Sequence, residues 1–109
     1  MARLLADPPP TAVFVASDVM ALGAMAELRR QGVGVPEEVS VAGFDDIPGL
    51  EFTQPTLTTV RVPMAELGAA GVARLLGELD GERQITRGRL HPVELIVRDS
   101  TGPVPTGRR

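Results

Sequence analysis

A short apolar run that ends in two acids constrains the fold of this chain most strongly. Residues 39–42, Val-Ser-Val-Ala, have the β-branched, apolar character of a strand buried in a sheet. Asp45 and Asp46 follow almost at once, and Pro48-Gly49 then turns the chain. Ligands of open α/β sheets bind outside the carboxyl ends of the strands. The segment therefore predicts a parallel strand with a binding edge at its end.

A second strand with a similar ending lies upstream. Residues 12–16 are continuously apolar, as expected for a strand covered on both faces, and Ser17-Asp18 follows them. Either side chain can cap a helix, because its oxygen accepts hydrogen bonds from unpaired first-turn N–H groups. We expect Ser17, Asp18, Asp45 and Asp46 to line one edge of the sheet. At most one of the two adjacent acids should face a given cleft, and Asp46 is expected to bond its own backbone in the turn.

The remaining pattern predicts an α/β fold in which a mainly parallel sheet is flanked by helices. A helix is expected over residues 18–31, with Gly32 as a left-handed cap. A second, amphipathic helix is expected to open with Pro63 in its first turn and to stop at Asp80-Gly81. Short strands are expected at residues 57–61 and 93–97.

The first predicted helix is apolar on nearly all of its surface. Between Val19 and Leu28 only Glu27 is polar. Such a helix is buried on more than one side, and the sheet can cover only one of them. We therefore expect a homodimer in which a second copy covers the other side. An exchange of the second helix or the last strand between two chains is the other possibility.

Four collinear segments resemble one family of proteins. The first runs from Pro10 to Met25, and the others cover residues 32–47, with the Val-Ala-Gly-Phe-Asp-Asp sequence, 55–60 and 93–101. In this order they are similar to the LacI/GalR family of bacterial transcription regulators. The resemblance covers only the last third of such a regulator, so the chain looks like a fragment that lacks the DNA-binding domain.

The resemblance implies a division of the chain and a function for it. Residues 10–101 are expected to form a partial effector-binding domain, part of a periplasmic-binding-protein-like lobe. Residues 1–9 would be an N-terminal remnant or linker, and residues 102–109 a disordered tail. The implied function is effector sensing and dimerisation. The effector would be a sugar or nucleoside, bound weakly by this fragment, and DNA would be bound only through the missing N-terminal domain.

The family's ligand contacts carry over to three positions. Asp45 matches an acid that accepts hydrogen bonds from sugar hydroxyls. Ser17 stands where the family usually has Asn, so it has a shorter reach and is also a candidate helix cap. Met64 can pack on a sugar face or simply begin the apolar stripe of the second helix. The positions implied at the dimer interface are Leu22, Met25 and Phe52.

Composition excludes several other classes of function. The net charge is −3, so the chain has no general attraction to nucleic acid. It has no cysteine and a single histidine, His91, and it lacks a nucleophile elbow and a phosphate-binding loop. We therefore expect no enzyme activity, no catalytic residue, no cofactor and no metal. A phospho-acceptor receiver domain also has acids at strand ends, but the absence of any lysine argues against it.

The expected location is the cytoplasm. No apolar run approaches the roughly 20 residues that span a bilayer, and the first 16 residues lack the order of a signal peptide. A sugar-binding transport component with the same fold is the alternative to a regulator, and a secretion signal encoded upstream would favour it.

Overall fold

The computed structural model describes residues 9–81, 88 and 90–106. The chain divides into two compact units. The first contains residues 1–61 and 94–109, and the second contains residues 62–93. Residues 1–8 of the predicted N-terminal remnant and the last three residues of the predicted tail lie outside the described residues.

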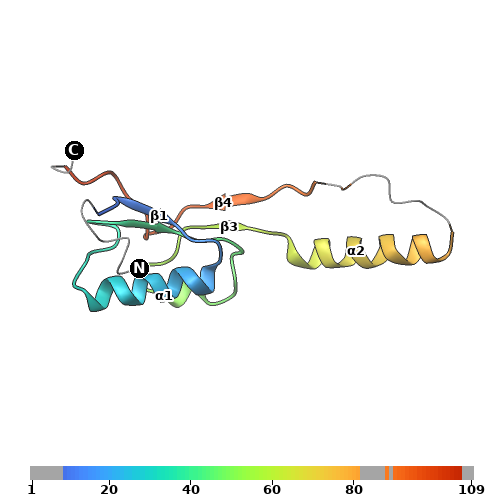
Figure 1. The fold of residues 1–109 in the computed structure, drawn as a ribbon, viewed down its shortest axis with the longest axis horizontal. Helices are drawn as coiled ribbons and strands as arrows, with labels where there is room; N and C mark the ends of the chain where they lie inside the picture. The colour runs from blue at the N-terminus through green and yellow to red at the C-terminus, as the bar shows by residue number, and fades with distance from the viewer. Residues whose placement is uncertain (1–8, 82–87, 89, 107–109) are drawn as a thin grey trace. The chain divides into compact units, whose positions relative to one another are not determined.

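Among its described residues, the first unit contains four short strands. Strands β1 (Ala12–Phe14) and β2 (Ser40–Ala42) pair in parallel, with Val13 opposite Val41. Two isolated parallel bridges, Ala42 with Thr58 and Asp45 with Arg61, continue this arrangement to β3 (Thr59–Arg61). Strand β4 (Glu94–Ile96) adds to β3 in the antiparallel direction (Figure 1). The predicted α/β fold with a mainly parallel sheet is confirmed, with an antiparallel pair at its end.

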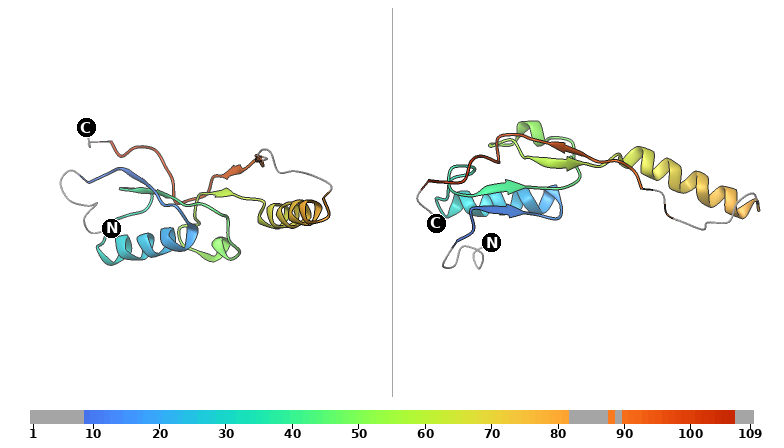
Figure 2. Two further views of the ribbon diagram at one scale, coloured as in Figure 1. Left: turned by 45° about the vertical axis from the view of Figure 1, so that its right-hand side comes forward. Right: turned by 90° about the horizontal axis from the view of Figure 1, so that it is seen from above.

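Helix α1 (Asp18–Arg30) follows β1 directly, and local sequence sets both of its ends. The Ser17 hydroxyl accepts a hydrogen bond from the Met20 N–H at 3.3 Å, as a helix cap does. Gly32 has a φ of 73°, the left-handed conformation that ends many helices. Both predicted caps are confirmed, and Figure 2 shows α1 running alongside the β1–β2 pair.

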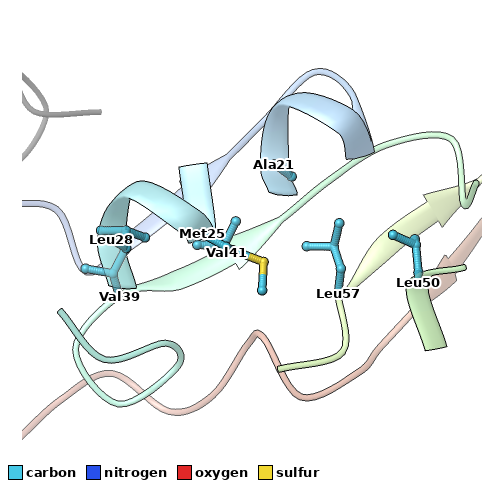
Figure 3. Close-up of a cluster of buried hydrophobic side chains, with 7 residues drawn as sticks. All are labelled: Ala21, Met25, Leu28, Val39, Val41, Leu50 and Leu57. Carbon is cyan, nitrogen blue, oxygen red and sulfur yellow. The ribbon is translucent and has the colours of Figure 1, made fainter. Parts of the chain in front are cut away.

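The core lies between one face of α1 and the strands. The helix contributes Ala21, Met25 and Leu28, which face the side chains of β2 and of the segment that leads into β3 (Figure 3). Because only three aromatic residues are present in the chain, this core is aliphatic. The other buried apolar residues are Val39, Val41, Leu50 and Leu57.

The segment after β4 packs into the first unit through Ser100. The fully buried Ser100 hydroxyl donates to the Val41 carbonyl at 2.6 Å and accepts from the Thr58 N–H at 2.8 Å. Gly102, the first residue of the predicted disordered tail, accepts a hydrogen bond from the Ser40 hydroxyl and also donates one to it. The segment is therefore bonded into the unit as far as Gly102.

The second unit contains helix α2 (Met64–Leu79). Pro63 is the residue before the helix and not part of its first turn, so the predicted start is one residue early. Asp80 and Gly81, with a φ of 72°, end it as predicted. None of its residues is buried, and its exposed apolar side chains include Val72, Leu75 and Leu79. No helix in the part of the chain that the structure describes is long and apolar enough to cross a membrane.

Candidate functional site

Buried Asp18 connects the carboxyl ends of the parallel strands. Its backbone N–H donates to the Phe44 carbonyl at 2.9 Å, which joins the end of β1 to the end of β2. Its carboxylate is fully buried and accepts from the Thr59 hydroxyl at 2.6 Å and from the Ile47 N–H at 3.0 Å. Asp18 is therefore a structural residue that fixes the edge on which Ser17 and Asp45 lie.

Asp45 and Asp46 are held in an unusual backbone conformation. Their φ angles are 116° and 59°, in the region that side chains other than glycine rarely adopt. The Asp45 N–H donates to the Val60 carbonyl at 2.9 Å. Within residues 9–81, 88 and 90–106, no hydrogen bond or ion pair engages the Asp45 carboxylate, which is half-buried. This carboxylate is free to accept hydrogen bonds from a ligand.

The Asp46 carboxylate is bound by two guanidinium groups. Its Oδ2 lies 2.6 Å from Arg61 Nε, and its Oδ1 lies 2.7 Å from Arg98 Nη2. We call these three side chains the Asp46 clamp. Burial acts to raise the pKa of Asp46, but the hydrogen bonds and positive charges of Arg98 and Arg61 hold it below its usual value. The expectation that Asp46 bonds its own backbone is wrong, because both oxygens are directed to arginines.

Arg98 is a residue of this site that was not predicted from the sequence. This residue follows the apolar run at 93–97, so its charge stands at the end of a predicted strand. Arg98 Nη1 also donates to the Leu57 carbonyl at 2.8 Å. The available signal for Arg98 was its position at the end of one predicted strand, in a chain with paired acids at the end of another. Only the packing of β4 against β3 brings the two together.

The other two predicted ligand residues have different surroundings. Ser17 caps α1, so that expectation is confirmed, and its contact with a ligand stays a prediction. Met64 is the first residue of α2 and is 57% exposed in the second unit. The described residues hold no group of three or more His, Cys, Asp and Glu side chains that could bind a metal ion.

The predicted dimer residues differ strongly in exposure. Met25 is 5% exposed and packs in the core, which corrects the expectation that its side chain is available to a partner. Leu22 is half-buried beside the core, and Phe52 is 85% exposed. Arg29 Nη2 donates to the Gln54 carbonyl at 2.8 Å and so ties α1 to the segment that carries Phe52. A dimer surface is therefore a prediction that rests on Leu22 and Phe52.

Comparison with known proteins accounts for this arrangement. Residues 1–101 match the model of the periplasmic binding protein-like domain. The chain belongs to that family. It is 46% identical over 97 residues to the HTH-type transcriptional repressor CytR of Escherichia coli K12, and the alignment covers 89% of this chain. The predicted resemblance to LacI/GalR regulators is confirmed. The alignment covers only 28% of that repressor, so the present chain spans less than a third of the repressor's length.

Solved structures of regulators have the same fold. A LacI family transcriptional regulator from Enterococcus faecium with bound ribose superposes with a TM-score of 0.82 at 36% identity, over 94% of this chain and 38% of that one. The lac repressor dimer bound to operator superposes with a TM-score of 0.79 at 38% identity, over 91% and 35% of the two chains. This periplasmic binding protein-like chain thus corresponds to one part of a DNA-binding regulator.

Proposed function

We propose that this chain is the C-terminal, effector-sensing and dimerising part of a LacI/GalR-type transcriptional regulator that acts in the cytoplasm. The observation that carries the proposal is the Asp45 carboxylate, which lies without a partner among the described residues at the carboxyl ends of parallel strands. Ligands of open α/β sheets bind at such an edge. The regulators among its relatives support this function over a transport component.

The chemistry of this edge suits a polyol effector. A carboxylate only accepts hydrogen bonds, and sugar hydroxyls supply donors. The Ser17 hydroxyl adds a group at the neighbouring strand end. In the intact regulator the effector would change the arrangement of its lobes and, through it, the affinity for DNA. Because this coupling is reciprocal, DNA would change the affinity for the effector by the same factor.

We expect weak binding of D-ribose by this chain at Asp45. A cleft between lobes buries its ligand from both sides, whereas this chain matches 38% of the ribose-bound neighbour. Hydrogen bonds to one edge should give a Kd no tighter than about 1 mM. The measurement is a titration of the ¹⁵N-labelled chain with ribose, followed by NMR. Shifts should centre on Asp45 and be lost in Asp45→Ala.

Asp99→Ala is the matched control for this titration. Asp99 is an exposed acid whose carboxylate accepts a hydrogen bond from the Thr56 hydroxyl at 2.8 Å. Thr56 lies in the segment that precedes β3. Asp99→Ala should leave the ribose-dependent shifts unchanged. Binding that survives Asp45→Ala would contradict the site, and micromolar binding would contradict the expectation that one edge is insufficient.

We also expect the chain to dimerise through the exposed surface beside α1. A standard interface buries about 800 Å² per partner, and Phe52 is exposed next to a helix with apolar residues on its outer face. The double substitution Phe52→Glu with Leu22→Glu should raise the dissociation constant of the dimer by about 30-fold or more, as expected when a charged side chain replaces an aromatic anchor. Size-exclusion chromatography with light scattering over a concentration series measures this.

Leu79→Glu tests the competing arrangement. Leu79 is 83% exposed near the end of α2, so a charge there would disrupt a dimer formed by exchange or pairing of that helix. We expect this variant to remain dimeric. A monomeric unsubstituted chain would contradict dimerisation altogether. If only Leu79→Glu abolishes the dimer, the interface lies on α2 and not beside α1.

A further inference from the structure

The Asp46 clamp joins three segments that are far apart in the sequence. Arg61 is the last residue of β3, Asp46 lies in the turn after β2, and Arg98 follows β4 by two residues. The Asp46 side chain is 8% exposed, that of Arg98 20% and that of Arg61 51%. Each carboxylate oxygen has its own guanidinium donor, so the carboxylate is fixed in position and orientation.

The turn at residues 45–46 requires contacts of this kind. Both residues have positive φ values, and left-handed backbone is unfavourable for residues that carry a side chain. The Asp45 N–H donates to the Val60 carbonyl, and the Ile47 N–H donates to the Asp18 carboxylate. Among the described residues, the clamp is the only side-chain interaction of either acid. It therefore holds the second half of the turn.

Fixing Asp46 also determines the direction of Asp45. The two residues are adjacent, and Asp46 is directed toward the arginines from β3 and from the segment after β4. We propose that Asp46, held by Arg61 and Arg98, is a positioning residue that presents the Asp45 carboxylate to the effector. This inference rests on the proposed function for its ligand, but the position of Asp45 is measurable without any ligand.

A purely structural ion pair is the alternative, and it makes a different prediction. A structural pair would change the stability of the unit and leave the backbone at Asp45 as it is. A positioning role changes the chemical shifts of Asp45 itself. Glu94 supplies a matched control, because its Oε2 lies 3.5 Å from Arg61 Nη1 and its side chain is 69% exposed, outside the turn.

The experiment compares the unsubstituted chain with Asp46→Asn and Glu94→Gln, each labelled with ¹³C and ¹⁵N. In Asp46→Asn the Cα and carboxyl shifts of Asp45 should move, and its amide exchange should accelerate by about tenfold as the turn opens. The affinity for D-ribose should fall by about tenfold, as expected when a charge-assisted contact that orients the binding group is lost. Glu94→Gln should match the unsubstituted chain in all three measurements.

A pH titration gives an independent measurement. The carboxyl ¹³C signal of Asp46 should titrate below the usual range of aspartate, because its pKa is lowered in the fold. The clamp then stabilises the fold above the unfolded-state pKa of about 4, and this contribution is lost as pH falls through the lower folded-state pKa. The Asp45 amide shift should follow the same inflection, and this inflection should be absent from Asp46→Asn.

Two outcomes separate the positioning role from the proposed function. Unchanged Asp45 shifts and exchange in Asp46→Asn would overturn the positioning role, whatever the stability of the variant. No ribose-dependent shifts in the unsubstituted chain would count against ribose as the effector, while the ligand-free measurements still decide the role of the clamp. If Asp46→Asn does not fold, Arg61→Gln removes only the half-exposed partner and should produce the same changes at smaller amplitude.

Discussion

Replacing Gly43 with alanine should destabilise the folded chain by about 2–4 kcal/mol, the combined effect of overpacking and disturbed buried hydrogen bonds. A Cβ at this position would fall well inside van der Waals contact of Asp18 Oδ1 and 3.1 Å from Leu57 Cδ2. Asp18 cannot yield easily, because its fully buried carboxylate accepts from Thr59 and Ile47. Without tryptophan or tyrosine in the chain, urea denaturation is best followed by circular dichroism.

Gly23→Ala is the matched control for this substitution. Gly23 lies within α1, and beyond the local helix backbone and its chain neighbours no atom would lie within 4 Å of an added Cβ. Alanine in place of glycine in an open helix position should stabilise the chain by about 0.5–1 kcal/mol. The two substitutions therefore have opposite signs. Equal urea midpoints for the two variants would contradict the assignment of Gly43 as a residue required by close packing against Asp18.

The parts of the fold that local sequence determines were predictable. Ser17 marks the start of α1 and Gly32 marks its end, because a hydroxyl cap and a left-handed glycine act within one turn of the backbone. The strands at 12–14 and 40–42 lie inside the predicted runs, whose apolar residues mark them as buried. Observed strands are shorter than the runs because hydrogen-bonded pairing stops before the apolar pattern does.

The parts that depend on distant segments could not be read in the same way. Asp46 appeared to be a turn residue because its partners, Arg61 and Arg98, lie 15 and 52 residues further along the chain. Met25 appeared to be an interface residue because an apolar helix does not reveal which of its faces is covered. The prediction that only one of the adjacent acids faces the ligand remains consistent with a paired Asp46 and an unpartnered Asp45.

The largest effect of removing a single oxygen atom is expected for Ser100→Ala. The Ser100 hydroxyl bridges the Val41 carbonyl and the Thr58 N–H, and both hydrogen bonds lie in the interior. Alanine would leave that carbonyl and that N–H without this partner and with little access to water. Each unsatisfied buried group costs about 1–3 kcal/mol, so a loss of about 2–4 kcal/mol in the free energy of unfolding is expected.

Ser40→Ala is the matched control, because it also removes a serine hydroxyl, but one whose hydrogen bonds lie in exposed surroundings. The Ser40 hydroxyl exchanges hydrogen bonds with Gly102 at 3.1 and 3.4 Å, in exposed surroundings where water can replace it. A change below about 1 kcal/mol is expected there. Urea denaturation gives the two free energies, and amide exchange at Thr58 should accelerate only in Ser100→Ala. Equal losses of stability in the two variants would contradict this role of the Ser100 hydroxyl. The segment after β4 would then be held against β2 and Thr58 by other contacts.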